Sequence, residues 1–429
     1  MTSFFTSRFN TMRKSLQTPN QFLFYVLVGV ACSLIAFSFL ISSPTEILIG
    51  LDKIIRHPST LITDYFVVGG AGAALFNGGV VALIFLALLK RYNSKISGLT
   101  FAAIFLLIGF SFLGKNILNI WSIISGVYLY TYYHKQKFSS YIYVAIFATA
   151  MSPLVSEFIM FLSFPLPVKI IIGTLLGAAI GFMIPPLSTH LLRTHQGYNL
   201  YNVGFTTGLL LTIIVAILKS IGFNPLPQMI WGTEFNALLA PFLYILFGSF
   251  IILAFIHSRH AFYHYKQLFS YSGRLVTDFL SLEHLSGTLL NMGINGILST
   301  SFVLLVGSHL NGPTVGGIFT IVGFSAFGKH LKNIYPITIG IILNTILNGY
   351  SLQTPSVILA ALLSTGLAPV AGQYGVVWGI IAGYIHLSVN LHVSHMHGGL
   401  NLYSNGFAAG LVAAILIPII DSFRKDDSL

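Results

Sequence analysis

Two lysines stand at matching positions within long apolar stretches of this sequence. Residues 109–121 read GFSFLGKNILNIW and residues 323–335 read GFSAFGKHLKNIY, with seven of the thirteen positions identical. A charged group in an apolar environment is costly and is usually retained for a function. Lys115 and Lys329 could together attract an anion, or one of them could be displaced by a cation or a proton. The alternative is that each lysine extends from a helix end to lipid headgroups.

Four asparagines accompany the lysines. Asn119 and Asn333 follow four residues after them, on the same helical face, and could bind a solute or tie helices together. Asn77 and Asn291 lie in the middle of apolar runs and are flanked by glycines, which weaken a helix. We therefore expect a broken, pore-lining helix at these two positions, with close packing through small residues as the alternative. The two lysines and four asparagines are the predicted substrate-binding residues.

Histidines and one glutamate are candidates for carrying a proton or another coupling ion. Two pairs of histidines recur at an offset of 202 residues, namely His190 and His195 with His392 and His397. Glu157 lies within an apolar run. The segment 386–397 holds four histidines, but no cysteine or nearby carboxylate completes a metal site there. We therefore predict neither a metal nor a cofactor.

The composition predicts a membrane protein. Hydrophobic residues make up 55% of the 429 residues and charged residues only 7%, whereas a soluble domain carries about 25% charged residues. The formal net charge is +11, but the basic residues lie in short loops between apolar runs, which argues against a nucleic-acid partner. The single cysteine, Cys32, cannot form an internal disulfide.

Apolar runs recur along the whole chain and predict an all-α integral membrane protein with about fourteen transmembrane segments. The runs lie near 21–41, 65–89, 97–113, 116–133, 140–163, 167–184, 199–221, 237–257, 285–307, 313–327, 333–349, 354–369, 374–391 and 404–420. A bilayer span needs about 20 residues, so the shorter runs are expected to be broken or re-entrant helices.

The distribution of lysine and arginine predicts the orientation. With a cytoplasmic N-terminus, all basic residues face the cytoplasm except Lys53, Arg56, Lys115, Lys169 and Lys219. Both termini are then cytoplasmic, and the expected location is the bacterial inner (plasma) membrane. The expected partners are the lipid bilayer and a small polar solute or ion, with a homo-oligomer as a further option.

An internal repeat is the strongest pattern in the sequence. At the offset of 214 residues that relates the two lysines, Thr63-Asp64 matches Thr277-Asp278, and LFNGG at 75–79 matches LLNMG at 289–293. At an offset of 202 residues, NLYNVGFTTGLL from Asn199 matches NLYSNGFAAGLV from Asn401, again with seven identities. Asp64, Asp278, Asn199 and Asn401 are expected to cap helices.

The repeat divides the chain into two membrane units. The expected parts are a cytoplasmic segment 1–20, a first repeat 21–222, a connector 223–236, a second repeat 237–420 with a polar linker at about 258–276, and a cytoplasmic tail 421–429. Each unit has about seven spans. Because seven is odd, the two units must enter the membrane with opposite orientations, as in many secondary transporters and some channels.

The LFNGG, GFSFLGKN and NLYNVGF blocks make the chain resemble an uncharacterised family of bacterial multi-pass membrane proteins that is known by a duplicated domain of unknown function. This resemblance implies a membrane location and no particular activity. The plan of seven plus seven inverted segments is also similar to the nucleobase and anion transporter fold, whose specific signatures are missing. Urea channels are similar in plan too, but Asn77 is followed by Gly78 and not by their proline.

The sequence therefore favours a transporter or channel for a small polar solute or ion, with its site between the two repeats. It predicts a protein that is not an enzyme. One alternative is an intramembrane enzyme that uses the histidine-rich segment 386–397. Another is a structural or sensory membrane protein, which would have a solid core without a cavity.

Overall fold

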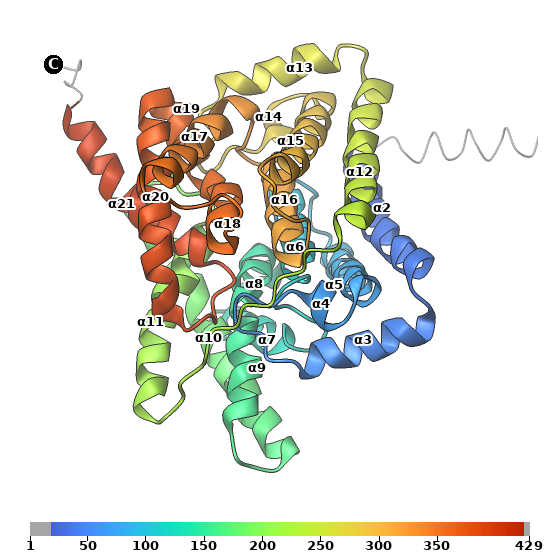
Figure 1. Ribbon diagram of the computed structural model, residues 1–429, viewed down its shortest axis with the longest axis vertical. Coiled ribbons are helices and arrows are strands. Elements are labelled where there is room, and N and C mark those ends of the chain that lie inside the picture. The colour runs from blue at the N-terminus through green and yellow to red at the C-terminus, as the bar shows by residue number, and fades with distance from the viewer. Residues whose placement is uncertain (1–18, 424–429) are drawn as a thin grey trace, which may run out of the picture.

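The computed structural model describes residues 19–423, and among these the chain is helical, apart from one isolated bridge between Thr63 and Ile230. The all-α class predicted from the sequence is confirmed for this part of the chain. The expected cytoplasmic segment 1–20 lies outside the described residues except for 19–20, and the expected tail 421–429 lies outside them except for 421–423. Figure 1 shows the first half, in blue and green, below the second half, in yellow to red.

Within residues 19–423, each half contains ten α-helices in the same order. In the first half they are α2 (Pro19–Ile41), α3 (Pro44–Arg56), α4 (Tyr65–Val68), α5 (Ala71–Arg91), α6 (Gly98–Phe110), α7 (Trp121–Tyr133), α8 (Ile142–Ala148), α9 (Ser152–Phe161), α10 (Leu166–Thr194) and α11 (Asn202–Ser220). In the second half they are α12 (Asn236–His257), α13 (Ala261–Gln267), α14 (Phe279–Leu282), α15 (Leu285–Leu305), α16 (Gly312–Phe324), α17 (Leu331–Leu347), α18 (Pro355–Leu363), α19 (Ala368–Tyr374), α20 (Val376–Val393) and α21 (Ser404–Phe423).

Ten helical segments of the described region are long and apolar enough to cross a bilayer, which makes the chain a helical membrane protein. Three further apolar helices, α6, α16 and α17, have only 10–17 residues. The expected number of fourteen spans is therefore not confirmed. The reason lies in helices such as α6, whose 13 residues rise about 20 Å, whereas the hydrocarbon core is roughly 30 Å thick.

Helix α3 shows how the chain enters the first repeat. Ser43 and Glu46 form a reciprocal capping box at its start, which satisfies backbone N–H groups that a helix leaves unpaired. One face buries Ile47 and Ile54, and the other carries exposed charged residues. This amphipathic pattern indicates a helix that lies along the membrane surface.

The same helix pairs recur in both halves. Helix α2 packs against α5 as α12 packs against α15, and α7 packs against α10 as α17 packs against α20. Two other pairs join the halves, α6 with α16 and α11 with α21. At the α6–α16 crossing, a Cβ atom on Gly109 would lie 2.8 Å from the carbonyl oxygen of Gly316, so both backbones need glycine there.

Two aspartates cap the short helices of the opposite half. The Asp64 carboxylate accepts hydrogen bonds from the N–H groups of Gly312 and Gly232, and it caps α4 as well. The Asp278 carboxylate accepts from the N–H of Gly98 and caps α14. The predicted capping role of both aspartates is thus confirmed, but each also holds the N-terminus of α16 or α6 across the molecule.

Candidate functional site

The two lysine-bearing blocks form breaks after α6 and α16. In each break the chain leaves the helix at a serine, Ser111 or Ser325, and passes through the lysine before the next helix begins. The side-chain amide of Asn77 donates to the carbonyl oxygens of Ser111 at 2.8 Å and Lys115 at 2.9 Å. Asn291 makes the same two bonds at 2.7 Å in the second half, to Ser325 and Lys329.

The expectation of broken helices at Asn77 and Asn291 is wrong. Helices α5 and α15 run unbroken through these residues, because their glycines face neighbouring helices, as Gly79 faces α2. The breaks lie instead in the partner segments after α6 and α16. The asparagines supply the hydrogen bonds that those interrupted backbones lack.

Asn119 and Asn333 hold the same two breaks from within. Asn119 donates to the carbonyl oxygen of Gly114 at 3.0 Å, and Asn333 donates to that of Gly328 at 2.9 Å. Each side-chain oxygen also accepts a backbone N–H three residues earlier. All four predicted asparagines therefore bind main-chain groups of the protein and fix the loops that carry the lysines.

The two lysines are both buried, but their surroundings differ. Lys329 Nζ donates to the hydroxyl of Tyr201 at 2.5 Å and to that of Thr365 at 2.8 Å. Lys115 Nζ has no hydrogen-bond partner in the described part of the chain and lies 5.1 Å from the centre of the Phe110 ring. The reading in which these lysines extend to lipid headgroups is excluded for this conformation, because both side chains are fully enclosed.

A second constellation also occurs twice, and it is closed in the first half. His195 is buried and bonds through Nε2 to the side-chain oxygen of Asn202 at 2.9 Å, while its Nδ1 accepts from the N–H of Asn199 at 3.4 Å. The Asn199 amide donates to the carbonyl oxygen of Gly406 at 3.1 Å. The Asn202 amide donates to the carbonyl oxygen of Ser188 at 3.0 Å. The polar side chains of this site are thus hydrogen-bonded to one another or to main-chain groups.

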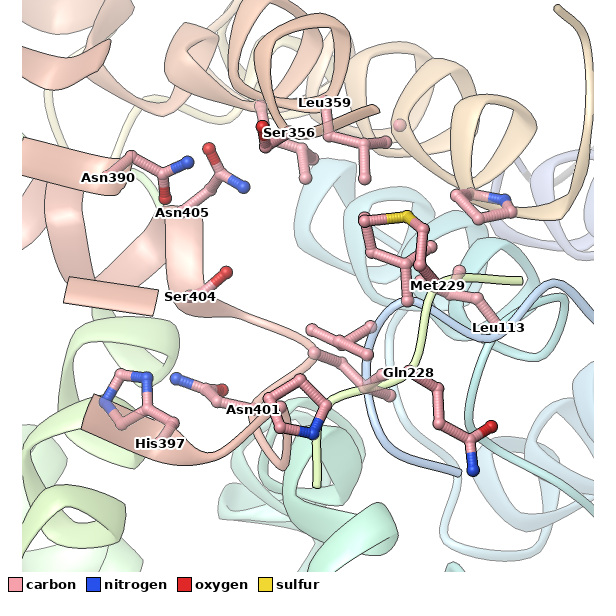
Figure 2. A pocket seen from close by; sticks show the side chains of 18 of the residues that line it. Leu113, Gln228, Met229, Ser356, Leu359, Asn390, His397, Asn401, Ser404 and Asn405 are labelled. Carbon is pink, nitrogen blue, oxygen red and sulfur yellow. The ribbon is translucent and has the colours of Figure 1, made fainter. Parts of the chain in front are cut away.

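The corresponding site in the second half surrounds a cavity of about 280 Å³. Its polar wall comes from α20, the turn after it, and the start of α21, and it carries Asn390, His397, Asn401, Ser404 and Asn405 (Figure 2). The opposite wall is largely apolar. It consists of Leu113 from the first break, Met229 from the segment between α11 and α12, Leu359 from α18, and further aliphatic residues.

Several polar atoms around this cavity lack partners within the described residues. They are Asn390 Oδ1, Asn405 Oδ1, Asn401 Nδ2 and His397 Nδ1, and each belongs to a side chain less than 7% exposed. Buried polar groups in proteins are nearly always hydrogen-bonded, so a cluster of unpaired ones requires an explanation. A bound molecule or water supplies the missing partners most directly.

The remaining candidates lie apart from the cavity. Glu157 accepts a hydrogen bond from the N–H of Ser59 at 2.6 Å and so fastens the segment before α4 to α9. His190 and His392 are exposed. Within the described residues, no three histidine, cysteine or acidic side chains are placed to hold a metal ion.

Sequence reasoning missed most of the cavity residues. Only His397 was a predicted site residue, and Asn401 was expected to cap a helix; Asn390, Ser404 and Asn405 were not singled out. They could have been found as departures from the repeat, because their first-half counterparts are Ser188, Asn202 and Val203. Residues that are identical in the two halves belong mainly to the backbone framework that both halves share.

The fold and the site define a helical membrane protein made of two related halves, with a polar cavity in which residues of both halves meet. The model of a family described as a protein of unknown function (DUF1576) matches residues 43–220 and 257–422, and the chain belongs to this family. The resemblance stated from the sequence blocks is therefore confirmed. No curated protein matches the chain, and neither does any solved structure.

Proposed function

We propose that the protein is a membrane transport protein, a secondary transporter or channel, that carries a small polar solute through the cavity beside Asn390 and Asn405. One observation carries this proposal. The histidine and asparagine that recur in the repeat are hydrogen-bonded in the first half, at His195 and Asn199, whereas His397 Nδ1 and Asn401 Nδ2 of the second half lack partners within the described residues and lie beside a cavity. A protein with two related sites, one sealed and one open, has the asymmetry that alternating access requires.

The arrangement of the halves supports this proposal. In our proposal the two halves are inverted repeats of about seven segments each, with short helices α6 and α16 crossing at the centre. The cavity borders the segment that joins the halves, because Gln228 of that segment lines it. Backbone hydrogen bonds hold Gln228 to Leu61 and Ile62 of the first half. With cytoplasmic termini, this segment is extracytoplasmic, so the open site faces outward and the sealed site faces the cytoplasm.

Cysteine accessibility tests the proposal without knowledge of the solute. In a Cys32→Ser background, Asn390→Cys places a thiol in the cavity, and Ser188→Cys places one at the matching position of the sealed site. We expect a membrane-impermeant thiol reagent to label Asn390→Cys from the extracytoplasmic face only, and to leave Ser188→Cys unlabelled from that face. A solid structural protein would leave both thiols unlabelled from either face, and this outcome would reject the transport proposal.

A further inference from the structure

We propose that the cavity selects a small uncharged molecule that carries an amide-like pair, an N–H donor beside a carbonyl acceptor, on an apolar body. This inference rests on the proposed function and names the class of solute. It is carried by two side chains, Asn390 of α20 and Asn405 of α21, and by the chemistry of the walls around them.

The unpaired side chains of Asn390 and Asn405 indicate a ligand. Their side chains are 4% and 6% exposed, and neither carboxamide makes a hydrogen bond within the described residues. The framework asparagines Asn77, Asn291 and Asn333 all bond to main-chain carbonyls. An unpaired buried polar group costs about 1–3 kcal/mol, so two of them in one wall are hard to explain unless a bound molecule pairs with them.

A carboxamide presents an acceptor oxygen and two N–H donors side by side. The group that pairs with it in two bonds therefore also has a donor next to an acceptor, as when an asparagine recognises adenine. Figure 2 shows Asn390 and Asn405 at the same wall, with Ser404 below them and the imidazole of His397 further along. Primary amides, lactams and cyclic ureas have the matching arrangement.

The walls argue against a charged solute. Among the residues that line the cavity there is no lysine, arginine, aspartate or glutamate. An ion moved into such a site loses its hydration without gaining an opposite charge, which costs several kcal/mol. Lys115 was a candidate for attracting an anion, but its side chain is fully buried, with Nζ 5.1 Å from the centre of the Phe110 ring, and it does not line the cavity.

The cavity volume and its apolar wall limit the size of the solute. A volume of about 280 Å³ corresponds to about nine water molecules at roughly 30 Å³ each. A ring of five or six atoms with one amide group fits this space, with the ring against Leu359, Met229 and Leu113. Sugars and polyols would leave that wall without an apolar partner.

Three probes of equal size separate the possibilities: nicotinamide, nicotinate and 3-acetylpyridine. They share a ring and differ in one group, which is an uncharged amide, an anion or a ketone without N–H donors. We expect nicotinamide at millimolar concentration to raise the Tm of the detergent-purified full-length protein by mass action. Its binding should be at least about tenfold tighter than that of the other two, because an unpaired buried amide discriminates strongly.

The repeat supplies the variants for this experiment. Asn390→Ser and Asn405→Val introduce the first-half residues Ser188 and Val203, and each should weaken nicotinamide binding about tenfold or more. Asn348→Ser makes the same kind of change at an exposed residue directly after α17 and should leave binding unchanged. The Tm of each variant without probe establishes that it folds.

Three results would overturn the inference: nicotinate binding as tightly as nicotinamide, no probe binding, or undiminished nicotinamide binding in both cavity variants. The cysteine-labelling experiment tests the transport proposal separately from the proposed class of solute. If Asn390→Cys is labelled from one face and no amide binds, the solute class is wrong and the water-accessible cavity stands. If Asn390→Cys is unlabelled from both faces, the transport proposal itself fails.

Discussion

Lys115 and Lys329 occupy the same position in the two halves, yet only Lys329 has partners. Its ammonium bonds to Tyr201 and Thr365, one from each half. The counterparts of these residues near Lys115 are Tyr403 and Thr149, but neither bonds to it. Both threonine hydroxyls donate to a carbonyl oxygen three residues earlier, so this bond does not distinguish the halves. The Tyr403 ring packs against Phe110, 4.9 Å between centroids.

The same division holds for the histidine constellations. Residues around Lys329 and His195 are hydrogen-bonded to one another, whereas those around Lys115 and His397 keep unpaired atoms. The shared sequence blocks build the same backbone twice. A few substitutions between the halves decide which copy is fully hydrogen-bonded. Parallel substitutions at matching positions of the two halves test this difference.

Replacement of the lysines should give the largest difference. Lys329→Met removes the two hydrogen bonds that the buried amine donates to the Tyr201 and Thr365 hydroxyls, so we expect a loss of about 3 kcal/mol in unfolding free energy. Lys115→Met removes an amine that has no partner and should change stability by less than about 1 kcal/mol, or increase it. Denaturant unfolding in mixed micelles measures both. Equal losses would show that the lysines are equivalent in the native state.

Replacement of the capping aspartates comes next. Asp64 is fully buried and accepts from three backbone N–H groups, whereas Asp278 is half-buried and accepts from two. We expect Asp64→Ala to cost about 2 kcal/mol and Asp278→Ala about 1 kcal/mol, because side-chain caps contribute in this range. The same unfolding measurement applies. A larger loss for Asp278→Ala would reverse the order of the two caps.

Asn199 and Asn401 give a smaller and closely matched difference. Both side-chain oxygens accept a backbone N–H two residues later, but only the Asn199 amide also donates, to Gly406. We expect Asn199→Ala to cost about 1 kcal/mol more than Asn401→Ala, which is the value of one hydrogen bond. If the two variants lose the same stability, the open and sealed sites do not differ at this position.

The smallest expected effect is a pH dependence of stability. It arises from histidines of the second half that have no histidine counterparts in the first half. The His284 ring stacks on His264 with centroids 4.3 Å apart, where the first half has Gly70 and Gly50. Partial burial, and then the neighbouring His264 and His257, lower the pKa of His284. The native state therefore takes up this proton less readily than the unfolded chain.

The stability that depends on neutral His284 is present above about pH 6.5 and is lost as the pH falls. We expect a small drop in Tm between pH 7.5 and pH 5.5, and a smaller drop in His264→Asn, which removes one cause of the shift. His190→Asn, at an exposed histidine, serves as the control. An unchanged pH dependence in His264→Asn would exclude the stacked pair as its source.

The sequence predicted the framework better than the site. Composition and apolar runs identified a helical membrane protein, but the breaks predicted at Asn77 and Asn291 lie instead at the lysine-bearing blocks after α6 and α16. The number of spans was less certain, since α6 and α16 are shorter than the runs that contain them. The amino-acid sequence does not show whether an asparagine side chain is hydrogen-bonded. Asn77 and Asn405 are both buried in helices, but only the Asn77 side chain bonds to main-chain groups.

The reciprocal caps have a consequence for how such a chain can arise and be divided. Asp64 holds Gly312 and Asp278 holds Gly98, so the same contact is made twice, with the roles of the two halves exchanged. This is the pattern of a twofold-symmetric dimer, in which each subunit completes the other. A single-copy ancestor with these contacts would have functioned as a pair of identical chains, and either half of the present chain, expressed alone, would leave a short helix uncapped.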